Sequence, residues 1–169
     1  MKRTVRPLVF GDWQHIVEQW HSSVPPLVPD DLAFYLVRNP NTSLVCIENT
    51  QLCGVVLAGH DGWRGYIRWL ALTGSNAKDQ QAIAVELFTA LWRHLGQDGI
   101  AVCQVDGFTL PFGLDWPAMG WRTIPNTTDQ TILQYNLAQQ TVAPKGLSGC
   151  LSCPIADRGP RITSLAEDN

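Results

Sequence analysis

At residues 54–72 the chain reads GVVLAGHDGWRGYIRWLAL. Apolar, strand-like runs lie on both sides of the turn at His60-Asp61-Gly62, which is the pattern of a β-hairpin. A further run of this kind, residues 44–47, precedes a turn at Asn49-Thr50. Three consecutive antiparallel strands are therefore expected.

Downstream of these strands the hydrophobic period changes from two to about four residues. The longest predicted helix covers residues 78–95, and an apolar run at residues 100–105 follows it. One face of the predicted helix carries Ile83, Leu87, Leu91 and Leu95. A strand, a helix and a second strand in this order predict a right-handed crossover between parallel strands. The sheet is thus expected to change from antiparallel to parallel midway.

The remaining elements complete one mixed α/β domain. A first strand is predicted at residues 4–10, followed by a helix capped by Asp12 and a second helix that starts at Pro29. Residues 114–119 predict a short helix, and residues 131–137 predict the last strand. The fold class is α/β with a mixed sheet, in the order β-α-α-β-β-β-α-β-α-β.

The domain is predicted to occupy residues 1–137. Beyond residue 137 hydrophobic periodicity disappears, and Gly, Pro and Ser recur up to Asn169. Such a segment cannot bury enough apolar surface to offset the entropy of ordering it. Residues 138–169 are therefore expected to form a disordered tail.

Composition excludes several classes of function. The chain has 169 residues, a formal net charge of −3 and no run of Lys or Arg, which argues against nucleic acid as a partner. It has neither an apolar stretch of about 18 residues nor a signal-peptide pattern. A cytoplasmic protein with no membrane partner is expected.

Cysteine usage points to reduced thiols. The number of cysteines is five, and Cys46, Cys53 and Cys103 fall in apolar, strand-like runs. Cys150 and Cys153 have the C-x-x-C spacing, but the second half of a zinc site is missing. No metal is therefore predicted.

Two segments carry a specific resemblance to a known family. Residues 54–72 are similar to the pattern G-x-x-x-x-G-x-D-G-x-R-G-x-I-x-x-L-A-V, and residues 116–121 (WPAMGW) look like Y-E-x-L-G-F/W. Both patterns belong to the GNAT superfamily of acetyl-coenzyme A dependent acyltransferases. The resemblance implies an N-acetyltransferase with acetyl-CoA as cosubstrate. The acetyl group would pass by direct attack to a primary amine of a small molecule or a protein.

The resemblance also implies where the coenzyme binds. Main-chain groups of Leu70, Ala71 and Leu72 would pair with the pantetheine arm, which lies in the gap between the two halves of the sheet like an extra strand. The start of the following helix would receive the pyrophosphate. The residues expected there are Lys78, Gln80, Gln81, Ala82, Ile83 and Ala84. The family loop reads R/Q-x-x-G-x-G/A, and this chain departs from it at Asp79 and Ala82.

No catalytic residue is assigned. Trp116 stands where many family members have a tyrosine that protonates the departing thiolate, and an indole cannot act as a useful acid. His60, Asp61 and Glu48 are candidate bases, and the spacing selects none of them. Arg64 and Arg68 are interpreted as solvated or paired side chains.

Two other readings of the sequence stay open. A GNAT-like module that has lost its chemistry would serve as a ligand sensor or an assembly partner, and Asp79, Ala82 and Trp116 favour it. An unrelated α/β binding protein would show a continuous sheet. A homodimer is also open, with Trp20 and Trp63 as candidates for its contact or for the wall of an acceptor pocket.

Overall fold

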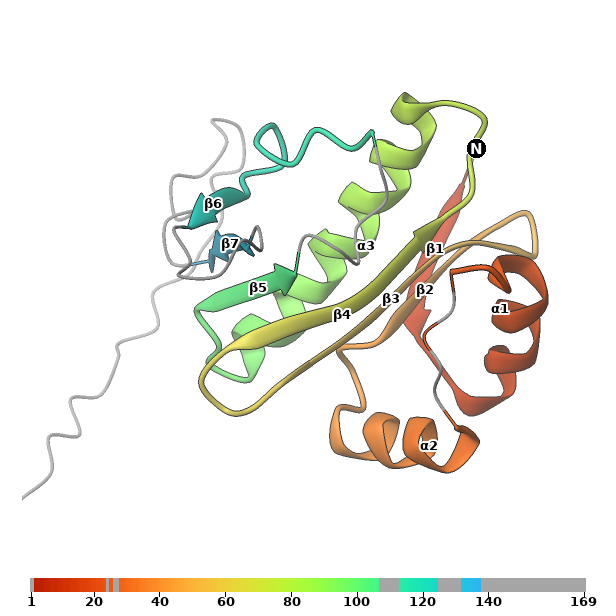
Figure 1. Cartoon of the computed structure of the whole chain (residues 1–169), viewed down its shortest axis with the longest axis horizontal. Helices are drawn as coiled ribbons and strands as arrows, with labels where there is room; N and C mark the ends of the chain where they lie inside the picture. The colour runs from red at the N-terminus through yellow and green to blue at the C-terminus, as the bar shows by residue number, and fades with distance from the viewer. Residues whose placement is uncertain (1, 24, 26–27, 107–112, 125–131, 138–169) are drawn as a thin grey trace, which may run out of the picture.

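The structure is a computed structural model, which describes residues 2–23, 25, 28–106, 113–124 and 132–137. Seven strands of these residues form one mixed sheet in the order β1-β2-β3-β4-β5-β7-β6 (Figure 1). The strands are β1 (Arg3–Pro7), β2 (Leu44–Glu48), β3 (Gln51–His60), β4 (Gly65–Leu72), β5 (Val102–Asp106), β6 (Arg122–Ile124) and β7 (Ile132–Asn136). Neighbouring strands from β1 to β4 are antiparallel, β4 and β5 are parallel, and β7 is antiparallel to both β5 and β6.

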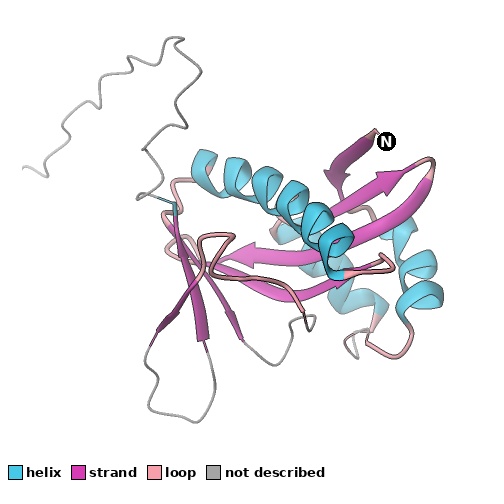
Figure 2. Ribbon diagram, turned by 90° about the horizontal axis from the view of Figure 1, so that it is seen from above, coloured by secondary structure: helices cyan, strands magenta, loops and turns pink. Residues whose placement is uncertain are grey.

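Helices cover both faces of the sheet. The long helix α3 (Ala77–Gln97) lies on one face, and the short helices α1 (Trp13–Trp20) and α2 (Pro29–Arg38) lie on the other (Figure 2). A single 3-10 turn, η1 (Phe10–Asp12), leads into α1. None of the helices in the described part of the chain combines the length and the apolarity needed to span a bilayer.

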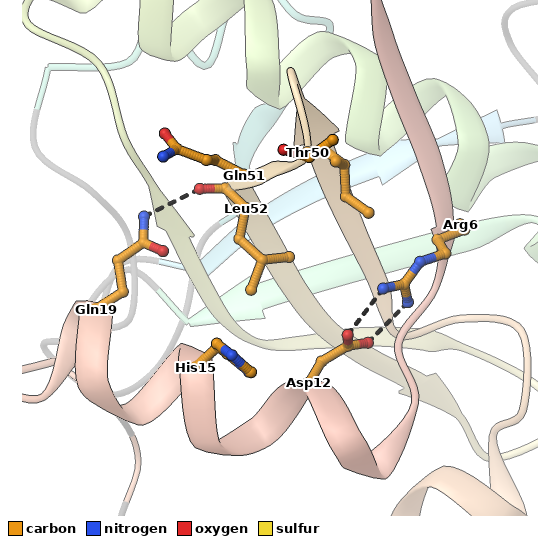
Figure 3. Close-up of a pocket in the computed structure, with 8 residues that line it drawn as sticks. Arg6, Asp12, His15, Gln19, Thr50, Gln51 and Leu52 are labelled. Atoms are coloured by element: carbon orange, nitrogen blue, oxygen red, sulfur yellow. Dashed lines mark hydrogen bonds and ion pairs between the residues drawn. The ribbon is translucent and has the colours of Figure 1, made fainter.

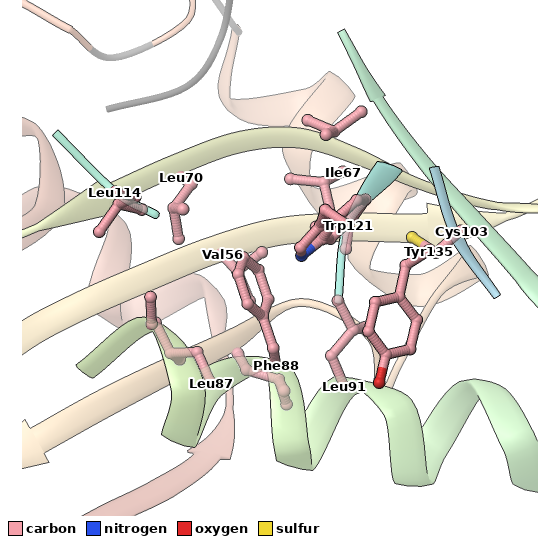
Figure 4. Close-up of a cluster of buried hydrophobic side chains, with 14 of the residues drawn as sticks. Val56, Ile67, Leu70, Leu87, Phe88, Leu91, Cys103, Leu114, Trp121 and Tyr135 are labelled. Carbon is pink, nitrogen blue, oxygen red and sulfur yellow. The ribbon is translucent and has the colours of Figure 1, made fainter. Parts of the chain in front are cut away.

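Two hydrophobic clusters hold these layers together. The larger one joins α3 to the sheet and includes Ile83, Leu87, Leu91 and Leu95, as the predicted helix face requires. Figure 4 shows this cluster between α3 and the strands. The smaller cluster lies under α1 and α2, where Trp69 of β4 is buried.

The predicted mixed α/β fold class and the change from antiparallel to parallel strands are confirmed. The predicted strand at residues 4–10 is shorter, because it ends at Pro7, which has no N–H to continue a ladder. The predicted helix at residues 114–119 is wrong for the described part of that stretch. Residues 116–120 form turns there, with Gly120 at φ 89°.

Other expectations have mixed outcomes. Strand β6 has only three residues and was not predicted, and Phe34 of α2 is 75% exposed. Cys46, Cys53 and Cys103 are buried and unpaired, as expected. Burial raises the pKa of the Cys103 thiol to about 12, so it stays protonated. The predicted tail, residues 138–169, and the pair Cys150 and Cys153 lie outside the described residues.

Candidate functional site

The sheet opens between β4 and β5. The two strands pair only from Gly65 to Ile67, opposite Cys103 to Val105. On its other side β4 stays paired with β3 as far as Leu72. Figure 1 shows β4 continuing past the end of β5. Among the described residues, no strand therefore pairs with residues 68–72 of β4 on the side of β5, and main-chain groups at that edge are available to a ligand.

A β-bulge lies where the two strands separate. Ala58 of β3 is opposite Ile67 of β4, but the next residue, Leu57, is opposite Trp69. Arg68 is thus the extra residue of the bulge. A bulge bends its strand and increases the local twist, which can end pairing with a neighbour. The bulge at Arg68 accounts for the loss of β5 pairing directly after Ile67.

The open edge leads to the start of α3. Asn76 caps this helix, because its side-chain Oδ1 accepts the Asp79 N–H at 3.0 Å. The Asn76 Nδ2 in turn donates to the Asp79 carboxylate at 2.7 Å. The N–H of Gln80 makes the first bond of the helix, to the Asn76 carbonyl, at 3.2 Å. The amides of Ala77 and Lys78 precede it, so no carbonyl of the helix can accept from them.

A glycine lets the connecting loop pack closely on this helix start. Gly74 has φ 132°, a backbone conformation that residues with a side chain rarely adopt. A Cβ on it would also lie 3.0 Å from Gln80 Cγ and 3.2 Å from the Gln80 N. The absence of a side chain at Gly74 thus lets the loop pack against the first turn of α3.

The structure separates the predicted coenzyme residues into three groups. Leu70, Ala71 and Leu72 lie on the open edge of β4. Lys78 lies in the first turn of α3 and is exposed. Ala82, Ile83 and Ala84 lie in the second turn, where backbone N–H groups donate within the helix.

Gln80 and Gln81 use their side chains within the protein. The Gln80 Nε2 donates to the Gly74 carbonyl at 3.4 Å. The Gln81 Oε1 accepts from the Asp115 N–H at 3.3 Å, which ties the segment of residues 113–121 to the beginning of α3. These bonds occupy one N–H of Gln80 and the carbonyl oxygen of Gln81.

Trp116 packs in the core of the domain. Its side chain is 9% exposed, and its ring lies 5.8 Å from Phe88 and 5.5 Å from Trp121. The two candidates for a pocket wall were Trp20 and Trp63. Trp20 packs edge-on against Trp69, with ring centres 6.3 Å apart, whereas Trp63 is 78% exposed on the β3–β4 turn.

The three candidate bases are all engaged. The His60 Nδ1 accepts the Gly62 N–H at 3.2 Å, and its Nε2 lies 3.3 Å from the carboxylate of Asp98. The carboxylate of Asp61 accepts the N–H groups of Trp63 and Arg64, both at 2.8 Å. These bonds lower the pKa of Asp61, which makes it a poorer base.

Glu48, the third candidate, lies on β2, two strands away from β4. Its carboxylate is 3.1 Å from the Arg3 guanidinium. The pair joins β1 to β2 and is remote from the open edge. Within the part of the chain that the structure describes, none of the three predicted bases is thus free at the opening.

A cavity of about 290 Å³ lies beside the closed end of the opening, on the face that carries α2. Its lining includes Tyr35 of α2, Gly59 of β3, and Tyr66 and Arg68 of β4. The Arg68 guanidinium lies 5.6 Å from the centre of the Tyr66 ring. Burial raises the pKa of Tyr35 to about 12, so its hydroxyl remains a donor at neutral pH.

A second cavity, of about 540 Å³, lies between α1 and the β2–β3 turn (Figure 3). Its charged groups bond to each other, with Arg6 Nη1 and Nη2 lying 2.7 Å and 2.8 Å from the two oxygens of Asp12. None of the residues that line it comes from β4, β5 or α3. The pair joins β1 to η1, and we assign it a structural role.

The Arg6–Asp12 pair predicts a pH-dependent stability. Arg6 lowers the pKa of Asp12, so the pair stabilises the fold above the ordinary carboxyl pKa of about 3.9. This contribution is lost as the pH falls through the lowered pKa. Asp12→Asn should cost about 1 kcal/mol at pH 7, and the difference from the wild type should shrink below about pH 4. Urea unfolding of both proteins at several pH values measures this difference in stability. A difference that does not change with pH would contradict the stabilising role of the Arg6–Asp12 pair.

Sequence reasoning missed several residues of the opening. Asn76 and Asp79 form the pattern of a helix cap, a signal that could have placed the helix start and its free amides at Ala77. Arg68 and Tyr35 had no such signal. Their proximity depends on a bulge and on how α2 packs over β3, which no local pattern encodes.

Similarity to known proteins is confined to three-dimensional structure. No protein-family model matches the chain, and no curated protein matches it. Among solved structures, Ard1 from Thermoplasma volcanium is similar with a TM-score of 0.63 and 10% identity, over 81% of this chain and 99% of that one. The putative acetyltransferase yncA from Salmonella typhimurium, with its cofactor acetyl-CoA, is similar with a TM-score of 0.58 and 16% identity. The similarity covers 86% of this chain and 99% of that one.

A third similar structure is the PaiA N-acetyltransferase of Thermoplasma acidophilum in complex with coenzyme A. Its TM-score is 0.57 and its identity 13%, over 80% of this chain and 99% of that one. These likenesses show that the chain has the fold of the GNAT superfamily. At such low identity the conclusion concerns the fold, and function has to be argued from the site.

Proposed function

We propose that this protein is an N-acetyltransferase that moves an acetyl group from acetyl-CoA to a primary amine of a small molecule or a protein. The observation that carries the proposal is the open edge of β4 beyond Ile67, which leads directly to the start of α3. Solved structures of the same fold contain acetyl-CoA or coenzyme A, which supports the choice of cosubstrate.

The residues present fit such a cosubstrate. Main-chain groups of Leu70, Ala71 and Leu72 would pair with the pantetheine arm as with an added strand. The amides of Ala77 and Lys78 would donate to the pyrophosphate, helped by the positive end of the α3 dipole and by the Lys78 charge. Gln80, Gln81, Ala82, Ile83 and Ala84 remain predicted neighbours of this site.

Acetyl-CoA would supply an acetyl thioester, which an unprotonated amine can attack directly. The chain would hold the two reactants together, which is a large part of the rate enhancement in such reactions. Trp116 is packed in the core and contributes no acid. A hydroxyl that stays protonated does lie near the closed end of the opening, on Tyr35.

Calorimetric titration with acetyl-CoA, followed by release of free thiol with a panel of amines, tests the proposal. Binding should also raise the melting temperature, because a ligand that binds only the folded state stabilises it. The absence of both heat and thermal stabilisation at millimolar acetyl-CoA would contradict the proposed function.

The second candidate is a binding module of the same fold that has lost catalysis. It is favoured by the carboxylate of Asp79, which lies in the first turn of α3 beside the amides proposed to bind pyrophosphate. A negative charge there opposes an anionic ligand. Absence of coenzyme binding, or binding without transfer to any amine, would favour this candidate over the enzyme.

Asp79→Asn should strengthen binding of acetyl-CoA about 3- to 10-fold, because it removes the opposing charge, while the new amide oxygen can still accept the hydrogen bond from the Asn76 Nδ2. Ala82→Gly is the control. Position 82 is exposed in the second turn, so glycine should leave affinity unchanged and destabilise the helix by about 1 kcal/mol. Calorimetry and urea unfolding measure the two effects. Equal affinities of Asp79→Asn and wild type would show that the pyrophosphate lies elsewhere.

A further inference from the structure

The cavity at the closed end of the opening is positioned to receive the acceptor. The pyrophosphate would lie at the start of α3, which follows Leu72 at the open end, so the reactive end of the pantetheine arm would lie toward Ile67. The α3 face is filled there by the packed side chains of Leu95 and Cys103. The opposite face carries the cavity lined by Tyr35, Tyr66 and Arg68.

The bulge directs Arg68 to this place. Side chains alternate between the faces of a regular strand, so Arg68 and Trp69 would point to opposite sides. The extra residue breaks the alternation. Trp69 is buried under α1 and α2, and Arg68 lines the cavity on the same side, directly after the last residue that pairs with β5.

Hydrogen-bond donors dominate the Arg68 end of the cavity. Among the described residues, no carboxylate lies within ion-pair distance of Arg68. The guanidinium lies close enough to the Tyr35 hydroxyl to interact with it. Arg68 offers up to five N–H donors and Tyr35 one O–H. The Tyr35 oxygen can accept one of these N–H groups, which leaves the Tyr35 O–H and the other N–H groups of Arg68 to bind an anion.

The other polar groups of the cavity are already engaged. Asn39 donates its Nδ2 to the Tyr35 carbonyl at 3.2 Å and accepts the His60 N–H at 3.0 Å. Asp61 accepts the Tyr66 hydroxyl at 3.1 Å in addition to its two turn amides. The His60 ring is held by Asp98 and by the turn. Arg68 and Tyr35 are thus the groups left for a ligand.

We propose that Arg68, together with the Tyr35 hydroxyl, binds the carboxylate of the acceptor, so that the amine acetylated is one that carries a carboxylate, as an amino acid does. This inference rests on the proposed acetyl transfer. The planar guanidinium matches a carboxylate with two parallel hydrogen bonds. A cavity of about 290 Å³ is at the small end of the range for ligand sites, which suits a small acceptor.

The test compares acceptors that differ only in the carboxylate. L-Alanine and L-threonine are compared with alaninamide and threoninamide, and kcat/KM is measured for each. The wild type should prefer the acids, and Arg68→Gln should reduce the acid-to-amide ratio about 10- to 100-fold. Because the same acceptors are compared in each variant, the different pKa values of their amines cancel.

Arg64→Gln is the matched control. Arg64 is an exposed arginine on the β3–β4 turn, outside the residues that line the cavity, and the substitution changes the net charge by the same amount. It should leave the ratio unchanged. Circular dichroism and the affinity for acetyl-CoA should match the wild type in both variants, since the coenzyme is proposed to pair with main-chain groups of the open edge, and the Arg68 side chain lines the cavity instead.

A binding measurement separates this inference from the proposed function. L-Threonine is titrated into the protein by NMR, with and without coenzyme A, and binding should be lost in Arg68→Gln but kept in Arg64→Gln. If acetyl transfer occurs while acids and amides react equally, or while Arg68→Gln keeps the preference, the inference is wrong and the enzyme stands. If coenzyme does not bind, the proposed function fails, and Arg68-dependent binding of L-threonine still decides whether the cavity is a carboxylate site.

Discussion

Replacing Ala77 by proline should weaken binding of acetyl-CoA about 10- to 100-fold, as expected for the loss of one hydrogen bond to a charged group. Ala77 is the first residue of α3. Proline is well tolerated at this position of a helix, because its missing N–H has no partner within the helix. The substitution thus removes a proposed pyrophosphate donor without removing a bond of the fold.

The local backbone supports this design. Asn76 is extended, with φ −151° and ψ 163°, which is the conformation that a following proline requires. Ala77 is exposed, so the ring displaces no core side chain. Calorimetry measures the affinity and urea unfolding the stability, with Ala77→Ser as the control that keeps the N–H. If Ala77→Pro binds acetyl-CoA as tightly as the wild type, the start of α3 does not hold the pyrophosphate.

Trp121→Ala should lower the free energy of unfolding by about 3–5 kcal/mol. Trp121 is 2% exposed. Its ring is the centre of an aromatic cluster, with ring centres at 5.5 to 5.6 Å from four others. The neighbours are Phe88, Trp92, Trp116 and Tyr135. They come from α3, from the turns before β6 and from β7, so the cluster fixes these elements to one another.

The effect should be large because β4 and β5 pair at only three positions. The half of the sheet beyond the opening therefore depends on side-chain packing against α3. Urea unfolding measures the loss, and Trp63→Ala, at a position 78% exposed, should change stability by less than about 0.5 kcal/mol. Trp121→Phe keeps most of the ring and gives a smaller loss if the alanine variant does not fold. Similar stabilities for Trp121→Ala and Trp63→Ala would refute the role of the cluster.

Local patterns were enough to predict most of the fold. Apolar runs around the turns at Asn49 and Asp61 predicted β2, β3 and β4, and the spacing of Ile83, Leu87 and Leu91 predicted α3. Each of these signals lies within one element and its flanking turns. Strand β6 gave no signal, because three residues are too few for a period.

The site was harder to predict, since its geometry depends on contacts between elements. The open edge of β4 was expected from the family resemblance, which places a gap where the sheet changes to parallel pairing. The bulge at Arg68 is a property of the register between β3 and β4, which the sequence of either strand alone does not reveal. The motif counterpart at residues 79–84 was expected around the helix start, but Asn76 caps the helix earlier and places Ala82 in the second turn.

Amide hydrogen exchange with and without acetyl-CoA tests the central claim most directly, because it reports on the β4 edge itself. We expect added protection in residues 68–72 of β4 and at residues 76–78, with β1 and β2 unchanged. Binding of acetyl-CoA that leaves residues 68–72 exchanging as in the free protein would contradict the account.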